Sequence, residues 1–250
     1  MPCQDTIWFT KPQKTNRKIW RYMDFEKFMS FIETQSLHFT SLNEMATKFD
    51  KYEGHYPYPQ VPMKDTSGVM RYLPKEAFGN FDITKSGGCV NCWHLNEDES
   101  YAMWKTYSNL GKGIAIQSTI ENLWDSFNKC RYDIYIGEVE YVDFDELSRT
   151  KEEWQRFHPK HLYLYKRRCF KFENELRAVV ELVSVEDGHI IPWNSNVGGI
   201  DVQIDLNKLV EKIWVSPSSS ERYEQLIEKI LLRYKIDKPV EQSSIDEKPS

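Results

Sequence analysis

The sequence lacks any apolar run long enough to cross a membrane. A membrane-spanning helix needs about 20 consecutive apolar residues, and no stretch of the 250-residue chain approaches that length. Residues 1–14 are polar and do not form the apolar core of a secretory signal. The five cysteines are an odd number without the spacing of a disulfide framework. These absences predict a soluble protein of the reducing cytoplasm with no membrane partner.

Positive charge is also in short supply. The chain has 33 Lys and Arg against 38 Asp and Glu, which gives a net charge of −5. Lys and Arg supply most of the affinity for phosphate backbones, so the balance argues against an extended nucleic-acid surface. The single dense basic run is Lys166-Arg167-Arg168, which we interpret as the end of a helix.

Familiar catalytic motifs are missing. Gly111-Lys112-Gly113 lacks the spacing of a P-loop, and there is no dinucleotide fingerprint, nucleophile elbow or His-Glu-x-x-His. Cys89, Cys92 and His94 are of the types that bind zinc. No second ligand pair follows them, and positions 89 and 92 face opposite sides of a strand. Buried thiols without a metal are therefore the favoured interpretation, and a zinc site is the alternative.

Aromatic residues, in contrast, are plentiful. The chain contains 8 Trp and 14 Tyr, more than a core of this size needs. We expect some of these rings to line a pocket or an interface.

Hydrophobic periodicity predicts strands and helices that alternate irregularly. The clearest strand runs from Phe170 to Leu182, with Phe170, Phe172 and Leu176 on one face. Without a strict strand–helix–strand rhythm, we predict an α+β fold with a mixed, mostly antiparallel sheet in a single domain. Further strands are expected at 19–23, 37–40, 89–95, 114–116, 134–142, 200–206 and 212–215, and helix starts near Asp24, Ser41, Asn96 or Asp98, Ser118 and Ser220.

The domain boundaries follow from composition. Residues 1–16 read as a polar lead-in, 17–237 as the domain and 238–250 as a flexible tail. Within the domain, 50–73 is an irregular segment rich in Pro and Tyr. A loop of this length is typical of a lid, a binding loop or a mobile insertion.

One candidate binding surface is a helical stripe. Ser100, Met103, Trp104 and Tyr107 share one face of the helix expected there. These side chains could simply be core. Three of them, Ser100, Trp104 and Tyr107, carry polar atoms that need partners when buried, which favours a site.

A second candidate is a run of alternating charges. Glu173 and Glu175 are two residues apart on the predicted strand, and Lys171 and Arg177 flank them. The run is either a solvated sheet face with weak ion pairs or the wall of a cleft. In a cleft, neighbouring carboxylates shift each other's pKa and can act as base, hydroxyl acceptor or metal ligand.

A third candidate is Arg21-Tyr22 on the first strand. Arginine offers a rigid fork of donors for phosphate or carboxylate.

The order of these motifs resembles a bacterial and phage family of unknown function, the domain of unknown function numbered 2971. The likeness runs from about residue 19 to 235. The chain departs from the family pattern at 41–50, where an insertion separates Asn43 from Asp50. The matching motifs are Trp20-Arg21-Tyr22, Asp50-x-Tyr52-Glu53-Gly54, Cys92-Trp93-His94, Met103-Trp104-x-x-Tyr107, Phe172-Glu173-x-Glu175-x-Arg177 and Ile213-Trp214-Val215-Ser216-Pro217.

The layout is also similar to that of ADP-ribosyltransferases, which implies an NAD site. In that analogy Arg21 and Tyr22 hold the dinucleotide, while Trp104 or Tyr107 stacks on a ring. The analogy makes Glu175 the catalytic residue, and Glu173 is the alternative candidate for that role. Ser100 and Arg177 complete the predicted binding set.

Three functions stay open at this point. The first is an enzyme that uses NAD or another nucleotide. The second is a non-catalytic module that binds a nucleotide or protein partner, in a defence or toxin–antitoxin context. The third is metal-dependent phosphodiester chemistry on Glu173 and Glu175, which usually needs more carboxylates than these.

Overall fold

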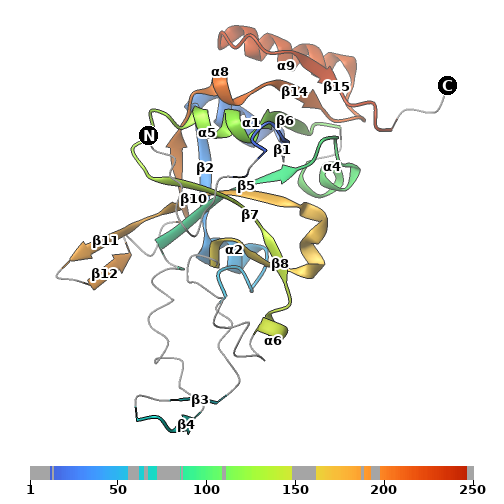
Figure 1. Ribbon diagram of the computed structural model, residues 1–250. Coiled ribbons are helices and arrows are strands. Elements are labelled where there is room, and N and C mark those ends of the chain that lie inside the picture. Colours follow the sequence, from blue (N-terminus) through green and yellow to red (C-terminus); the bar gives the residue numbers. More distant parts are fainter. Residues whose placement is uncertain are drawn as a thin grey trace.

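A computed structural model describes residues 12, 14–55, 62–64, 67–71, 85, 87–108, 111–147, 162–186, 189–192 and 198–246. Within them, helices surround a mixed, mostly antiparallel sheet, which confirms the α+β prediction (Figure 1). None of the helices in this described part is long and apolar enough to cross a bilayer.

The main sheet has nine strands in the described residues, and β5 lies at its centre. One edge of β5 pairs along its length with β10, which in turn pairs with β7. All pairs in this sheet are antiparallel except β14 with β15. The strands are β1 (Lys18–Met23), β2 (Ser36–Ser41), β5 (Gly88–Leu95), β6 (Ile114–Thr119), β7 (Ile134–Glu138), β10 (Glu175–Glu181), β13 (Gly199–Gln203), β14 (Lys212–Val215) and β15 (Val240–Gln242).

The other edge of β5 is shared between two strands, so the sheet forks there. β2 pairs with Cys89 and Val90 near the start of β5, and β1 pairs with His94 and Leu95 at its end. One branch continues to β13, and the other to β6, β14 and β15. Between the two pairings, the carbonyl of Cys92 accepts a hydrogen bond from a side chain instead of a strand.

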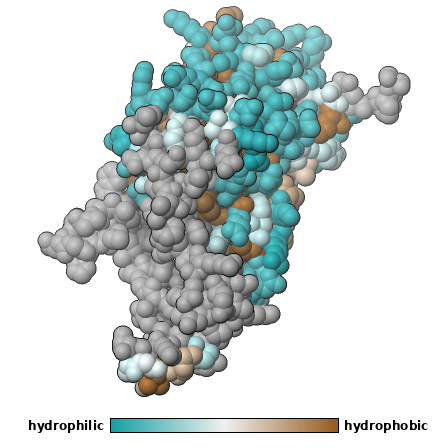
Figure 2. Space-filling view, viewed as in Figure 1, coloured by the Kyte–Doolittle hydropathy of each residue, from teal (hydrophilic) through white to brown (hydrophobic). Residues whose placement is uncertain are grey.

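The larger core lies on one face of this forked sheet. The helices α1 (Phe25–Thr34), α5 (Ile120–Ser126), α8 (Leu206–Leu209) and α9 (Glu221–Arg233) bury apolar residues there. Asp24 caps α1 as predicted, since its side chain accepts from the Lys27 amide. The outer side of α9 is largely hydrophilic, as Figure 2 shows at the top of the molecule.

The opposite face carries smaller clusters of packed residues. The helix α4 (Tyr101–Tyr107) packs its rings against β1, and α2 (Leu42–Lys48) packs against β5. Near this face lie β8 (Glu140–Val142), β9 (Tyr165–Arg167) and the 3₁₀ helix η3 (Arg168–Glu173). The candidate site lies on this face, whose core is the smaller of the two.

Short outlying elements complete the described fold. β3 (Met63–Lys64) pairs with β4 (Met70–Arg71), and β11 (Val183–Glu186) pairs with β12 (His189–Pro192). In Figure 1 both hairpins project from the body, and the short helix α6 (Phe144–Leu147) lies near the lower end.

The strand predicted from Phe170 to Leu182 is wrong in its first part. The strand begins at Glu175, because residues 168–173 form η3. Asn174 between them has a left-handed backbone conformation with φ 39°. Phe172 is consequently 49% exposed instead of lying in line with Leu176. The caps of two helices also shift: Ser100 caps α4, and Thr119 caps α5.

The flexible tail predicted at 238–250 is wrong for its described part. β15 pairs in parallel with β14, and the Ser243 amide donates to the carbonyl of Val215 at 3.0 Å. The side chain of Gln242 donates to the carbonyls of Pro217 and Ser219 at 3.1 and 2.8 Å. The polar composition of this segment hid a strand that completes the sheet edge.

Two other predicted segments lie partly outside the described residues. Of the lead-in at 1–16, the structure describes 12 and 14–16. The carbonyl of Thr15 accepts from the Glu121 amide at 2.9 Å. Of the irregular loop at 50–73, it describes 50–55 and the hairpin residues.

Gln242→Ala tests whether the C-terminal strand stabilises the domain. We expect the free energy of unfolding to fall by about 1–2 kcal/mol, because two carbonyls lose their donor. Glu241→Ala on the same strand is the control, since the Glu241 side chain is 46% exposed and its ion pair with Lys212 should contribute under about 1 kcal/mol. Equal losses in denaturant melts of the two variants would contradict this role for Gln242.

Candidate functional site

Glu175 and Arg177 lie at the start of β10, next to the end of β5. In the antiparallel register Glu175 is opposite His94 and Arg177 is opposite Cys92. Directly opposed residues in such a pair project to the same face. All four side chains are therefore on the face that carries α4 and η3.

Glu173 lies close to Glu175 although it is not part of strand β10, which the sequence did not predict. It is the last residue of η3, and the left-handed Asn174 then turns the chain into β10. The Asn174 side chain secures the turn by donating to the carbonyl of Leu95. The two carboxylates are thus brought together by a turn and not by strand alternation.

Arg177 holds two carboxylates at once. Its Nε donates to Glu175 at 2.7 Å, and its two terminal nitrogens donate to the two oxygens of Glu53, both at 2.9 Å. Nη1 also donates to the carbonyl of Tyr163 at 2.9 Å. Arg177 is 0% exposed and Glu53 is 1% exposed, so this bidentate pair is entirely inside the protein.

Lys166 contacts all three carboxylates of the site. Its ammonium donates to Glu173 and, at 2.5 Å, to Glu175, and it lies 3.5 Å from Glu53. The residue is only 6% exposed. We call these five side chains the buried charge cluster: Glu53, Lys166, Glu173, Glu175 and Arg177.

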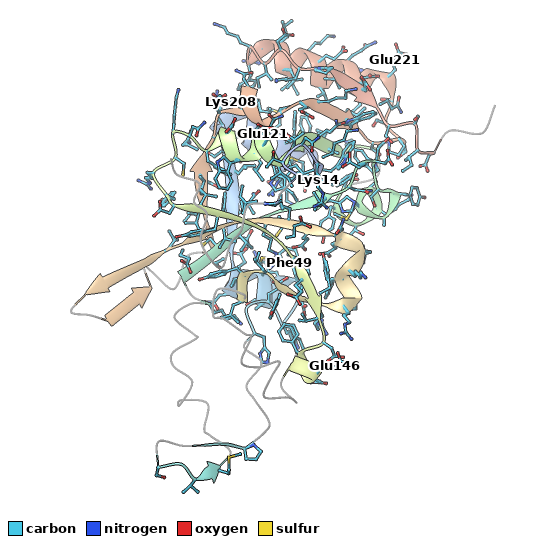
Figure 3. All side chains as sticks on the ribbon, viewed as in Figure 1. Lys14, Phe49, Glu121, Glu146, Lys208 and Glu221 are labelled. Carbon is cyan, nitrogen blue, oxygen red and sulfur yellow. The ribbon has the colours of Figure 1, made fainter. Side chains whose placement is uncertain are left out.

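Glu53 enters the cluster from the loop that follows α2. Phe49, labelled in Figure 3, ends the helix, and Asp50 then accepts from the Tyr52 amide at 3.1 Å. Asp50 is also paired with the guanidinium of Arg167, whose terminal nitrogen lies 2.6 Å from its carboxylate. Gly54 closes the turn with φ +63°, a conformation that favours glycine.

The basic run 166–168 is not the helix end that the sequence predicted. Lys166 and Arg167 lie in β9, and η3 begins at Arg168. Each cation is paired: Lys166 within the cluster, Arg167 with Asp50 and Arg168 with Glu146 at 2.9 Å. Alternation along β9 places Lys166 inside and leaves Arg167 partly exposed.

The buried charge cluster is not electrically neutral when all its groups are ionised. Three carboxylates meet two cations, which leaves one negative charge in excess. An uncompensated charge costs several kcal/mol in a buried site. The cluster must therefore take up a proton or another positive charge.

The pKa values of the two neighbouring carboxylates respond in opposite directions. Burial and the adjacent Glu175 raise the pKa of Glu173 to about 7 despite the Lys166 ammonium. Burial alone would raise the pKa of Glu175 too, but Arg177 and Lys166 hold it well below its usual range. The cluster thus contains one permanently ionised carboxylate beside one that gains or loses a proton near neutral pH.

Tyr107 connects the cluster to the surface. Its hydroxyl donates to Glu173 Oε1 at 2.7 Å, and the residue is 36% exposed at the end of α4. Burial and the Glu173 carboxylate raise the pKa of this phenol, so it remains a donor. Tyr107 and the two glutamates were all predicted site residues, and the structure brings them together.

Three other predicted residues have structural partners instead. Trp104 is 1% exposed, and its ring meets that of Tyr22 edge-on at 5.0 Å, so neither face is open to a ligand. Ser100 caps α4 with its side chain, and its backbone amide donates to the Tyr22 hydroxyl at 2.9 Å. The predicted stacking and binding roles of these three are not supported.

Arg21 lies on the other face of the sheet. Ile19 and Met23, which share its strand parity, belong to the main core, and the Arg21 guanidinium lies 6.0 Å from the ring of Trp93. Its Nη1 donates to the carbonyl of Cys92 at 2.9 Å, in the fork of the sheet. Arg21 thus holds the fork and does not share a face of the sheet with Glu175.

The cysteines of the candidate zinc motif differ in position. Cys89 lies in the main core, and Cys92 lies beside Arg177 on the other face. Burial raises the pKa of Cys89 to about 11 and that of Cys92 to about 12, so both are thiols. In the described part of the chain, no three His, Cys, Asp or Glu side chains are grouped as a metal site.

Two members of the cluster were not among the predicted site residues. Glu53 was part of a motif in the family resemblance, but the irregular loop gave no reason to bury it. Lys166 follows the apolar run Leu162-Tyr163-Leu164-Tyr165. A lysine at the end of such a run is a signal for a buried, paired cation.

No family model matches the chain, and no curated protein matches its sequence. Solved structures of DarT from Thermus sp. 2.9 are similar over most of their length. The complex with carba-NAD+ has a TM-score of 0.37 and 13% identity, covering 92% of this chain and 96% of that one. The complex with NAD+ has 0.33 and 12%, covering 94% and 98%. The complex with ADP-ribosylated ssDNA has 0.39 and 11%, covering 93% and 95%. At this distance the likeness assigns neither a family nor an activity.

Glu53→Ala tests how far the cluster supports the fold. We expect a loss of about 3–5 kcal/mol in the free energy of unfolding, because the buried guanidinium of Arg177 loses both bonds to this partner. Glu44→Ala is the control from the neighbouring helix, since its pair with Lys48 is exposed and should cost under about 1 kcal/mol. Equal stabilities of the two variants in chemical denaturation would show that the cluster does not support the fold.

Glu173→Gln tests the pKa of the raised carboxyl. A folded-state pKa near 7, above the ordinary 4.5, means that the folded protein binds the proton more tightly. The wild type should therefore lose stability relative to the variant as pH rises from about 5 to 7, with no further change above. The low pKa of Glu175 acts only below pH 4.5, outside this window. A difference that stays constant with pH, measured by urea unfolding, would show that Glu173 has an ordinary pKa.

Proposed function

We propose that the protein is an enzyme that cleaves the N-glycosidic bond of NAD or a related nucleotide, in the manner of an ADP-ribosyltransferase. The observation that carries this proposal is the excess negative charge of the buried charge cluster, with Glu173 and Glu175 side by side. Such a site favours a ligand or a transition state that brings one positive charge.

The reaction supplies that positive charge. The bond between the nicotinamide nitrogen and ribose C1′ breaks, and its electron pair stays on the nitrogen. Nicotinamide leaves as a neutral molecule, and the cationic character moves to the ribose ring as an oxocarbenium-like transition state. The ionised carboxylate of Glu175, held by Arg177 and Lys166, would stabilise this charge.

Glu173 would accept the proton of the incoming nucleophile as a general base. As the oxygen or nitrogen of the acceptor bonds to C1′, its proton passes to the Glu173 carboxylate. A pKa near 7 suits this role, since a general base works best when its pKa lies near the working pH. Tyr107, bonded to the same carboxyl, keeps it oriented toward the exposed rim.

Arg177 is a positioning residue in this proposal. Its donors are engaged by Glu53, Glu175 and the carbonyl of Tyr163, so it holds Glu175 and does not bind phosphate. Membership of the family of domain 2971, a cytoplasmic location and a role in defence or toxin systems are parts of the same proposal.

A non-catalytic binding module is the second candidate. It is favoured by the pairing of every member of the cluster with another member, as expected of a structural network. The third function, metal-dependent phosphodiester cleavage, is less favoured. Lys166 and Arg177 occupy carboxylate oxygens that metal ions would need.

Glu175→Gln separates catalysis from structure. With NAD present, we expect wild-type protein to release nicotinamide, and the variant to release it at least about 100-fold more slowly because the developing cation loses its counter-charge. The amide oxygen of the variant still accepts from Arg177, while its NH2 group replaces the oxygen that accepts from Lys166. We therefore expect thermal melts to show a cooperative transition at a lower temperature.

Glu44→Gln serves as the matched control and should release nicotinamide at the wild-type rate, because this residue forms an exposed pair away from the cluster. Absence of turnover in the wild type, or equal rates for wild type and Glu175→Gln, would sink the proposal and favour the binding module.

A further inference from the structure

His94 is a buried residue of the site that the proposed chemistry leaves unused. It lies on β5 between Glu175 of β10 and Trp20 of β1, and all three project to the same face. The residue is 5% exposed. It therefore stands at the border between the buried charge cluster and the ring cluster of Trp20, Tyr22 and Trp104.

One nitrogen of this imidazole is fixed by the backbone. Nδ1 lies 2.6 Å from the carbonyl oxygen of Glu173. A carbonyl oxygen only accepts, so Nδ1 carries the proton and Nε2 carries a lone pair. Burial lowers the pKa of His94, which keeps the ring neutral and Nε2 an acceptor.

None of the residues that the structure describes donates a hydrogen bond to Nε2. An unsatisfied buried acceptor costs about 1–3 kcal/mol, and such groups are rare in native proteins. Each carboxylate oxygen of the neighbouring Glu173 and Glu175 already accepts a hydrogen bond from a donor of the chain. Among the described side chains of the site, His94 is thus the acceptor left without a donor.

We infer that His94 Nε2 accepts a hydrogen bond from an N–H or O–H group of the nucleotide bound at this site. The inference rests on the proposed function, and it makes His94 a binding residue next to the two carboxylates. On NAD, the donor is either the carboxamide N–H of nicotinamide or a hydroxyl of the adjoining ribose. Both offer the same chemistry to Nε2.

Ligand entry requires a local shift, because Nε2 is closed off from solvent. We expect Tyr107 to move. It is 36% exposed, and its hydroxyl is held at the cluster by its bond to Glu173. The ring of Tyr22, edge-on to His94 at 6.2 Å, is buried and should stay in place.

His94→Asn is the discriminating variant. Asparagine retains an amide nitrogen near the Nδ1 position, which preserves the bond to the Glu173 carbonyl, and has no atom at Nε2. His38→Asn is the matched control, because His38 lies on β2 and pairs with Asp201 on the exposed sheet edge. NAD affinity is measured by calorimetry with a non-hydrolysable NAD analogue, alongside nitrogen NMR of the His94 ring.

If the inference holds, His94→Asn weakens binding about 10-fold, as expected for one lost hydrogen bond to a buried acceptor. His38→Asn binds like the wild type, and the Nε2 resonance of the wild type moves when the analogue binds. Unchanged affinity in His94→Asn, or an Nε2 resonance that does not move, overturns the role of His94 alone. A wild type that binds no analogue overturns the proposed function and this inference together.

Nicotinic acid adenine dinucleotide identifies the donor, because it carries a carboxylate in place of the carboxamide. If the carboxamide is the donor, the wild type prefers NAD and His94→Asn loses that preference. If a ribose hydroxyl is the donor, the variant weakens both dinucleotides by the same factor. Either result supports the inference, whereas a variant that binds both like the wild type overturns it.

Discussion

An unbalanced charge inside the protein is the constraint on which the site depends. Glu53, Glu173 and Glu175 share only two cations, Lys166 and Arg177, in a place that water barely reaches. Buried ion pairs are weak evidence for stability, because desolvation offsets much of their attraction. This buried cluster also has one negative charge in excess. A ligand or proton that brings one positive charge explains such an arrangement better than stability does.

The fold converges on this cluster from five directions. β10 carries Glu175 and Arg177, η3 carries Glu173, and β9 carries Lys166. The loop after α2 supplies Glu53, and α4 supplies Tyr107 at the rim. Because β5 forks to β1 and β2 beside the cluster, side chains and not strand pairing fill the fork. The site therefore lies on the continuous β5–β10 pair, across β5 from the fork where the regular hydrogen bonding of the sheet is interrupted.

Much of the fold and part of the candidate site could be predicted from the sequence. The predictions that were wrong have physical explanations. Period-two patterns revealed the strands, and the pair Glu173 and Glu175 was identified as a site candidate. The strand geometry assumed for that pair was wrong, because a left-handed turn at Asn174 cannot be seen in hydrophobic periodicity. Glu53 comes from a loop more than a hundred residues away, and only tertiary structure shows such a contact. Trp104 and Arg21 were expected to bind a ligand, but packing and the fork of the sheet use them instead.

The most direct test of the excess charge is the titration of the Glu173 carboxyl, followed by carbon NMR in the free and the ligand-bound protein. We expect a pKa near 7 for Glu173 in the free protein and a lower value with NAD, whose nicotinamide ring is cationic. NADH, whose ring is uncharged, should lower it less. An ordinary pKa near 4.5, or equal shifts with NAD and NADH, would contradict a site built to receive a positive charge.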